Sequence, residues 1–331
     1  MPSAIVPWLA AVIGAGAIAL GGCSPEDDAE PEGPSCEGCE WLVRGAPVRA
    51  AALDSDGQAL FALKLATKEL QRFPHEGAGM EEVATGLTSA FSFVVGERVI
   101  WLLVANGAAD TEEVVVLDKA SGAERSRQSL PGVFDLRKGP GGLPVVAVKI
   151  GATHRIIALD EDGEEAELYW EDESNTYFRS FSADASGVAW VLSDGFTDEL
   201  FWLAFGVEVV RLSVREHSLT TTGLVSHAGS LYAMGVGAND QERVLYRLAA
   251  DDLVELGRLP AKTEWLTPIG EAFVTSRQSS TDLHVFDLEG NELGIQTLPF
   301  SPNIAPVADD AWLFVGGESD LVRLALAELH R

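Results

Sequence analysis

A short unit that recurs about every 40 residues restricts the fold of this chain more than any other feature. From about residue 41, apolar runs alternate with turns of Gly, Asp, Ser and Asn, a pattern typical of short antiparallel strands. Each copy of the unit is a turn followed by an apolar strand. The copies are DSDGQALFAL (54–63), VGERVIWLLV (95–104), GGLPVVAV (141–148), ASGVAWVL (185–192), AGSLYAMG (228–235), IGEAFVTS (269–276) and DDAWLFVG (309–316).

The spacing of these copies predicts a β-propeller. The turn residues follow one another at intervals of 39, 46, 45, 42, 41 and 40 residues; they are Gly57, Gly96, Gly142, Gly187, Gly229, Gly270 and Asp310. A period near 40–45 residues that holds about four strands is the signature of propeller blades. We therefore expect an all-β domain over residues 41–331, with seven blades of four antiparallel strands. Six or eight blades are the alternatives, and a two-sheet sandwich would not show so many evenly spaced units.

The two ends of this domain are expected to pair. The chain ends soon after LVRLALAEL (321–329), which has the pattern of a third strand in the last blade. The missing fourth strand is available from EWLVRGAPV (40–48) near the start of the domain. Such pairing would close the ring and remove exposed sheet edges.

A second element, a strand, a polar turn and another strand, recurs within the period. Its copies are LFALKLATKELQRF (60–73), VVVLDKASGAERSR (114–127), IIALDEDGEEAEL (156–168) and LHVFDLEGNELGI (283–295). These segments resemble the core of PQQ-like repeats, and the domain is similar to PQQ-like and WD40-like propellers. The Trp that closes the PQQ-like motif is mostly absent. The first unit has two interpretations, because residues 54–73 fit either the first strands of a blade or the last ones.

Residues 8–22, WLAAVIGAGAIALGG, form an uncharged apolar run. The run is shorter than the roughly 20 residues that span a bilayer, and acidic, proline-rich sequence follows it. It therefore predicts a cleaved signal peptide over residues 1–22.

The four residues Leu20-Gly21-Gly22-Cys23 resemble the lipobox of bacterial lipoproteins. The resemblance implies cleavage between Gly22 and Cys23, and acyl chains such as palmitate on Cys23 that anchor the protein to a membrane. Ser24 in the next position suggests the outer membrane rather than the inner one. The first seven residues contain no Lys or Arg, whereas such signals normally start with a basic region. The alternative is an ordinary secretory signal followed by a chance cysteine.

Residues 23–40 are expected to form an extended tether. Positions 24–40, SPEDDAEPEGPSCEGCE, contain seven acids, three prolines and no base. Cys36 and Cys39 form a CxxC pair within this segment. A redox site would place such a pair at a helix N-terminus after a strand, and a zinc site would need a second pair of ligands. A local disulfide is the first expectation, free thiols the second, and a redox or metal site the last.

The charge of the chain narrows the class of partner. Asp and Glu number 51 against 23 Lys and Arg, which gives a net charge of −28. Such a surface repels phosphate backbones, so nucleic-acid binding is not expected. A basic or cationic partner is compatible with this charge. The alternative is that the charge only keeps the protein soluble.

No motif for catalysis or for a cofactor occurs in the chain. There is no HExxH, no GxSxG and no phosphate-binding GxxxxGK[ST], and the histidines are not clustered: His75, His154, His217, His227, His284 and His330. We therefore expect no catalytic residue, no metal ligand and no cofactor. The acidic turns Asp54-Ser55-Asp56-Gly57 and Asp160-Glu161-Asp162-Gly163 lack the ligand offsets of a calcium loop and fit tight turns better.

Trp101, Trp190 and Trp312 fall in the apolar strand of their units and are expected to pack between blades. Other tryptophans exposed at a channel mouth would suit a sugar or a peptide; the remaining ones of the domain are Trp41, Trp170, Trp202 and Trp265.

Two functions remain. The first is a non-catalytic module at the cell envelope, anchored in the membrane, that binds a protein or a polymer. The alternative is a propeller-type envelope enzyme, similar to a lactonase or a lyase, with or without calcium, whose active-site residues form no recognisable sequence motif.

Overall fold

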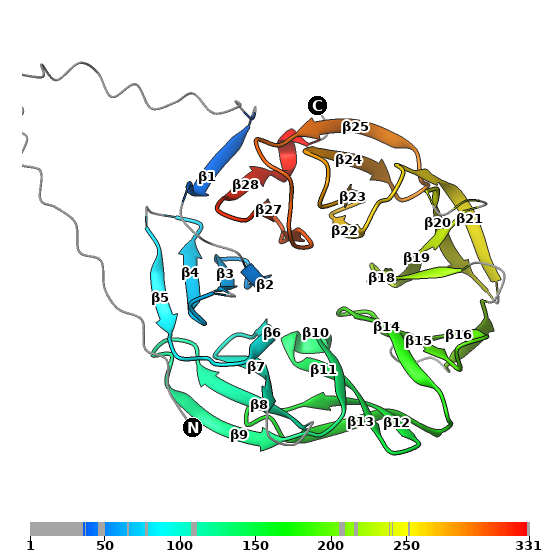
Figure 1. Ribbon diagram of the computed structural model, residues 1–331, viewed down its shortest axis with the longest axis horizontal. Helices are drawn as coiled ribbons and strands as arrows, with labels where there is room; N and C mark the ends of the chain where they lie inside the picture. Colours follow the sequence, from blue (N-terminus) through cyan, green and yellow to red (C-terminus); the bar gives the residue numbers. More distant parts are fainter. Residues whose placement is uncertain are drawn as a thin grey trace, which may run out of the picture. The chain divides into compact units, whose positions relative to one another are not determined.

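Seven four-stranded antiparallel sheets form a ring in the computed structural model (Figure 1). The structure describes residues 36, 38–45, 50–64, 66–76, 79–106, 111–204, 209–214, 218–237, 239, 241–250 and 252–329. The predicted signal peptide, Gly22, Cys23, and the histidines His217 and His330 lie outside these residues. Among the described residues, no helix is long and apolar enough to cross a membrane.

The blades follow one another along the chain. Blades 1 to 3 contain β2 (Ala50–Ser55), β3 (Ala59–Lys64), β4 (Leu70–Pro74), β5 (Glu81–Ala84); β6 (Ala90–Val95), β7 (Val99–Asn106), β8 (Thr111–Asp118), β9 (Glu124–Ser129); and β10 (Val133–Lys138), β11 (Pro144–Ile150), β12 (Thr153–Leu159), β13 (Glu165–Glu173). Blades 4 to 6 contain β14 (Tyr177–Ala183), β15 (Gly187–Ser193), β16 (Asp198–Ala204), β17 (Val210–Ser213); β18 (Leu219–His227), β19 (Ser230–Val236), β20 (Arg243–Ala249), β21 (Asp252–Leu259); and β22 (Trp265–Ile269), β23 (Ala272–Ser276), β24 (Asp282–Asp287), β25 (Glu292–Thr297). Blade 7 contains β26 (Val307–Ala308), β27 (Trp312–Gly316), β28 (Leu321–Ala325) and β1 (Cys39–Val43). Two short 3-10 helices are η1 (Pro140–Gly142) and η2 (Leu326–Glu328).

The all-β class and the count of seven blades are confirmed. Within each of the first six blades, the strands lie in chain order from the centre of the ring outwards (Figure 1). Blade 7 combines both ends of the domain, because β1 pairs with β28 as its outermost strand. Glu40 lies opposite Arg323 there, and Nη2 of Arg323 is 2.6 Å from Oε2 of Glu40. The expected closure by the N-terminal segment is therefore present.

The start of the domain differs from the expectation. The compact unit begins at Cys36, whereas the sequence pattern placed the boundary between tether and propeller at residue 41. Strand β1 takes in Cys39 and Glu40, because both pair with β28. The acidic composition of residues 24–40 concealed the beginning of this strand.

The seven repeated turns all join the first strand of a blade to the second. Residues 54–73 belong to the first three strands of blade 1, which decides between the two interpretations of that unit. The second recurring element is less uniform than the sequence suggested. Residues 114–127, 156–168 and 283–295 are third and fourth strands, whereas residues 60–73 are second and third ones.

The core lies between neighbouring blades, as expected for Trp101 and Trp190. Both side chains are fully buried, and the indole nitrogen of Trp101 in blade 2 donates to the carbonyl oxygen of Asp160 in blade 3 at 2.8 Å. The ring of Trp101 needs the space above Gly96, where a Cβ would stand 2.5 Å from it. Trp312 is partly buried and packs in the cluster between blades 7 and 1. Burial of such large side chains between adjacent sheets holds the ring together.

Candidate binding site at one end of the central channel

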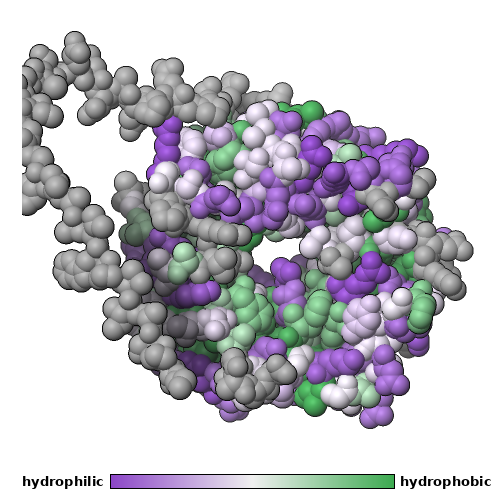
Figure 2. All heavy atoms as spheres, in the orientation of Figure 1, coloured by the Kyte–Doolittle hydropathy of each residue, from purple (hydrophilic) through white to green (hydrophobic). Residues whose placement is uncertain are grey.

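The innermost strands of the blades surround a channel along the axis of the ring. All of them run in the same direction, because every blade has the same antiparallel order. We call the end at which they begin the entry end, and the end at which they turn into the second strands the turn end. A hollow of about 720 Å³ lies in the channel between the innermost strands of blades 3 to 7. Figure 2 shows this opening at the centre of the molecule, with hydrophobic side chains along part of its edge.

A β-bulge interrupts the innermost strand near the entry end in blades 1 to 4, and in blades 2 to 4 the extra residue has a large side chain. The strand register shifts between Ala90 and Ser92 in blade 2, and between Val133 and Asp135 in blade 3. It shifts again between Phe178 and Ser180 in blade 4. The extra residues are Phe91, Phe134 and Arg179, each four positions before the end of its innermost strand. A bulge interrupts the alternation of a strand and redirects a side chain. Phe134 and Arg179 line the channel hollow, and Phe91 is exposed at the equivalent position of blade 2.

Phe134 is held firmly although 41% of it is exposed. Its ring stacks on that of Phe178 in blade 4, with the centroids 5.7 Å apart. Phe178 is buried and makes a T-shaped contact with the ring of His154, with the ring centroids 5.2 Å apart. Burial lowers the pKa of His154, despite a contact of 3.0 Å between its Nε2 and the carbonyl oxygen of Thr176. Phe134 thus offers a fixed aromatic face to a ligand.

Arg179 connects two hollows. Its guanidinium pairs with the buried carboxylate of Asp198 and lines the channel. It also lines a second hollow of about 510 Å³ on blade 4, together with Tyr177 and Phe196. Since Asp198 compensates the charge of Arg179, this arginine contributes hydrogen-bond donors and apolar stem more than net positive charge.

At the turn end, polar side chains bond to neighbouring blades instead of facing the solvent. Oδ1 of Asp184 in blade 4 accepts from the backbone N–H of Ser186 and Gly187 and from the hydroxyl of Ser226 in blade 5. The hydroxyl of Ser55 donates to Oδ2 of Asp309, which joins blade 1 to blade 7. These contacts tie the inner ends of adjacent sheets together.

Asp54 and Lys138 complete this network between blades 1, 2 and 3. Oδ2 of Asp54 accepts from the backbone N–H of Val95 at 2.7 Å, and Nζ of Lys138 donates to the carbonyl oxygen of Ser55 at 2.8 Å. Burial raises the pKa of Asp54 although the charge of Lys138 opposes the shift. The polar groups of the turn end are therefore engaged in structure.

The two acidic turns considered for calcium satisfy backbone donors. Oδ1 of Asp56 accepts from the N–H groups of Gln58 and Ala59, each at 2.8 Å. Burial would raise the pKa of Asp56, but bonds from Lys119 and these two N–H groups outweigh it and lower that pKa. Oδ1 of Asp160 likewise accepts from Asp162 and Glu164. In the part of the chain that the structure describes, no group of three or more His, Cys, Asp or Glu could hold a metal ion.

The structure does not bring the described histidines together. Nε2 of His227 lies 2.6 Å from the carbonyl oxygen of Gly270, and Nδ1 of His284 lies 2.6 Å from Glu292. His75 contacts Asp309 at 3.2 Å, and His154 is buried under Phe178. Of the four histidines that the structure describes, His227 alone lines the channel hollow.

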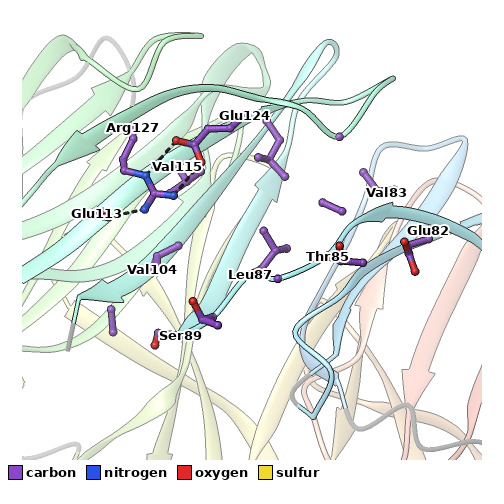
Figure 3. A pocket seen from close by; sticks show the side chains of 16 residues that line it. Glu82, Val83, Thr85, Leu87, Ser89, Val104, Glu113, Val115, Glu124 and Arg127 are labelled. Atoms are coloured by element: carbon purple, nitrogen blue, oxygen red, sulfur yellow. Dashed lines mark hydrogen bonds and ion pairs between the residues drawn. The ribbon is translucent and has the colours of Figure 1, made fainter.

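Another hollow, of about 680 Å³, lies between blades 1 and 2 (Figure 3). The cation labelled in this hollow is Arg127. Its guanidinium nitrogens lie 2.6 Å from Oε2 of Glu113 and 2.9 Å from Oε2 of Glu124. Bonds to Glu124 and Glu113 raise the pKa of Arg127 above its usual range. Because both carboxylates already satisfy this guanidinium, we place the candidate site at the entry end of the channel.

Cys36 and Cys39 form a disulfide at the beginning of β1. Both residues pack against the cluster that contains Leu298 and Leu329, and the amide of Gln296 contacts Sγ of Cys36 at 3.6 Å. The pair thus belongs to the edge of blade 7 and lies away from the channel-lining residues.

Comparison with known proteins supports the fold. No protein-family model and no curated protein matches the chain. A streptogramin B lyase structure is 13% identical with a TM-score of 0.60, covering 86% of this chain and 96% of that one. The β-propeller domain of Cps50 (Swd1) from Myceliophteria thermophila is 12% identical with a TM-score of 0.62, covering 86% and 98%. An oligogalacturonate lyase in complex with manganese is 11% identical with a TM-score of 0.59, covering 88% and 91%. The TM-scores establish a shared propeller fold. At such low sequence identity the activity has to be argued from the site itself.

Proposed function

We propose that this chain is a membrane-anchored bacterial lipoprotein whose propeller is a non-catalytic module that binds a protein or polymer at the entry end of its channel. The observation that carries the proposal is the placement of Phe91, Phe134 and Arg179 by equivalent bulges in three successive blades. Bulges that redirect side chains next to a hollow are typical of binding sites. Exposed aromatic residues and arginine are the side chains that dominate protein interfaces.

The state of the charged groups in the channel supports binding over catalysis. Arg137 pairs with Asp135 at 2.8 Å, and Arg179 pairs with Asp198. Asp184 is engaged by the turn that it caps. A general base must lie within reach of a nucleophile whose proton it can accept. The carboxylates of Asp135, Asp184 and Asp198 are instead engaged by the partners just described.

The proposed cellular location of the protein is based on the N-terminal sequence motif. Lipid on Cys23 and an acidic tether would hold the propeller away from the membrane surface, at the outer membrane rather than the inner one because of Ser24. Incorporation of labelled palmitate into the wild type, and its loss in Cys23→Ala, is the expected result. Incorporation that persists in Cys23→Ala would refute this anchor.

The binding function is tested by recovering partners from detergent-solubilised envelopes. The wild type should retain a partner that the double variant Phe91→Ala/Phe134→Ala loses by about tenfold or more. Ile295→Ala is the control, since Ile295 is also a large exposed apolar residue but lies on the outer strand β25. Thermal melting of each variant checks that the propeller is folded.

Two outcomes would contradict the binding proposal. One is recovery of the same partners by the double variant and by the wild type. The other is a rise in melting temperature with Ca²⁺ together with turnover of an envelope polymer, which would favour the alternative of a calcium-dependent propeller enzyme.

A further inference from the structure

We infer that the ligand of the entry end is a basic protein segment with apolar side chains, docked on blades 3 and 4; this inference rests on the proposed binding function. The surface consists of Phe134, Ile150, Tyr177 and Phe196, which we call the entry patch. Their exposed fractions are 41%, 49%, 49% and 88%. Large apolar side chains exposed together on one face mark interaction surfaces.

The members of the entry patch stand at the same end of two blades that contact each other. Phe134 of blade 3 stacks on Phe178, the neighbour of Tyr177 in β14. Nζ of Lys149, next to Ile150, donates to the carbonyl oxygen of Thr176. Tyr177 and Phe196 line the same hollow on blade 4. The patch therefore stands on one firmly connected base.

Carboxylates border the entry patch. Asp172 and Glu173 are exposed at the end of β13, and Asp194 is exposed in the turn that carries Phe196. Within the described residues, neither Asp172 nor Glu173 forms an ion pair. Bonds from the N–H groups of Thr197 and Phe196 lower the pKa of Asp194, so it stays ionised at neutral pH.

Among the described residues, two cations next to the entry patch, Lys149 and Arg179, are already engaged. Lys149 donates to Thr176, and Arg179 pairs with Asp198. The uncompensated charge of the described residues around the entry patch is therefore negative, as is the charge of the whole chain, −28.

This combination favours a basic, partly apolar protein segment over other ligands. The acidic field attracts cations and raises the rate of encounter. Aromatic faces bind both apolar side chains and the cations of Lys and Arg. An anionic polymer would meet repulsion from the rim, and a neutral glycan would gain no attraction from the net negative charge.

A direct test uses fluorescence anisotropy with the propeller and labelled 12-residue peptides. The probe alternates Lys and Leu, and its counterpart replaces each Lys by Gln. The Lys peptide should bind at least tenfold more tightly than the Gln peptide at low salt, and its affinity should fall as salt rises.

Two variants separate the rim from the overall charge. Asp172→Asn/Glu173→Gln should weaken binding of the Lys peptide about fivefold. Glu164→Gln/Glu167→Gln removes the same charge at the opposite end of the same blade and should change the affinity less than twofold. Phe196→Ser should weaken binding about tenfold, because it removes a central aromatic contact.

The inference is overturned if the two charge-neutralising pairs weaken binding equally, or if the Gln peptide binds as well as the Lys peptide. It is also overturned if the partner recovered from envelopes is a polysaccharide or a second copy of this chain. In each of these cases the binding function survives if Phe91→Ala/Phe134→Ala abolishes recovery. Loss of the function itself would appear as equal recovery by that double variant.

Discussion

The two ends of the channel are built from the same seven strands, yet they use their side chains in opposite ways. At the turn end, Asp54, Asp184 and Asp309 bond to backbone groups and to hydroxyls, several of them in the next blade. At the entry end, Phe134 and Phe196 face the solvent. One end therefore resists change because it supports the ring, whereas the other is free to vary with the ligand.

The largest expected effect on stability belongs to the turn end. Asp184→Ala leaves the N–H groups of Ser186 and Gly187 and the hydroxyl of Ser226 without their acceptor. We expect the free energy of unfolding to fall by about 2–3 kcal/mol, measured by urea denaturation. Asp194→Ala, which removes a similar cap from an exposed turn of the entry end, should lower the free energy of unfolding by less. Equal losses would break the contrast between the two ends.

A smaller, pH-dependent effect is expected from His154, a buried base under the entry end. Burial lowers the pKa of His154 in the folded protein, so below about pH 6.5 the unfolded chain binds a proton that the folded one resists. Stability should therefore be complete at neutral pH and fall as the pH drops from about 6.5 towards the folded pKa. The loss of stability between pH 7.5 and 5.5 should be larger in the wild type than in His154→Gln. Urea midpoints at both pH values measure it, and parallel pH profiles would contradict it.

The smallest effect on stability is expected for Phe196→Ser. Its side chain is 88% exposed, so its removal should change the free energy of unfolding by less than about 0.5 kcal/mol. The same variant is expected to weaken ligand binding strongly. A melting temperature that falls as much as for Asp184→Ala would show that the entry patch also supports the ring.

Much of the ring could be predicted from the sequence, because its period is long and its second strands are uniformly apolar. The turn end was also within reach, since Asp and Gly in tight turns act through local bonds such as those of Asp56. The closing role of the N-terminal strand followed from the missing strand in the last blade.

The entry end was missed because its residues depend on a change of register. Phe134 sits between the buried Val133 and Leu136, so the two inward residues are three positions apart instead of two. Ala90 and Phe93 repeat this spacing in blade 2. A search for such spacing at the start of each unit would have singled out Phe91 and Phe134. Nothing local identifies Tyr177 and Phe196 as neighbours, since only the packing of β14 beside the turn before β16 brings them into one hollow.

The closure of blade 7 by β1 has a consequence for the time course of synthesis. Glu40 and its partner Arg323 are 283 residues apart, so the first strand made is the last to find its place. Until β28 has been synthesised, β1 has no strand to pair with. The entropy cost of closing so long a loop is overcome only after the blades between the two strands have folded. Removal of the final two strands should therefore do more than delete half of blade 7. It should leave the ring open, with an unpaired strand edge through which incomplete rings associate.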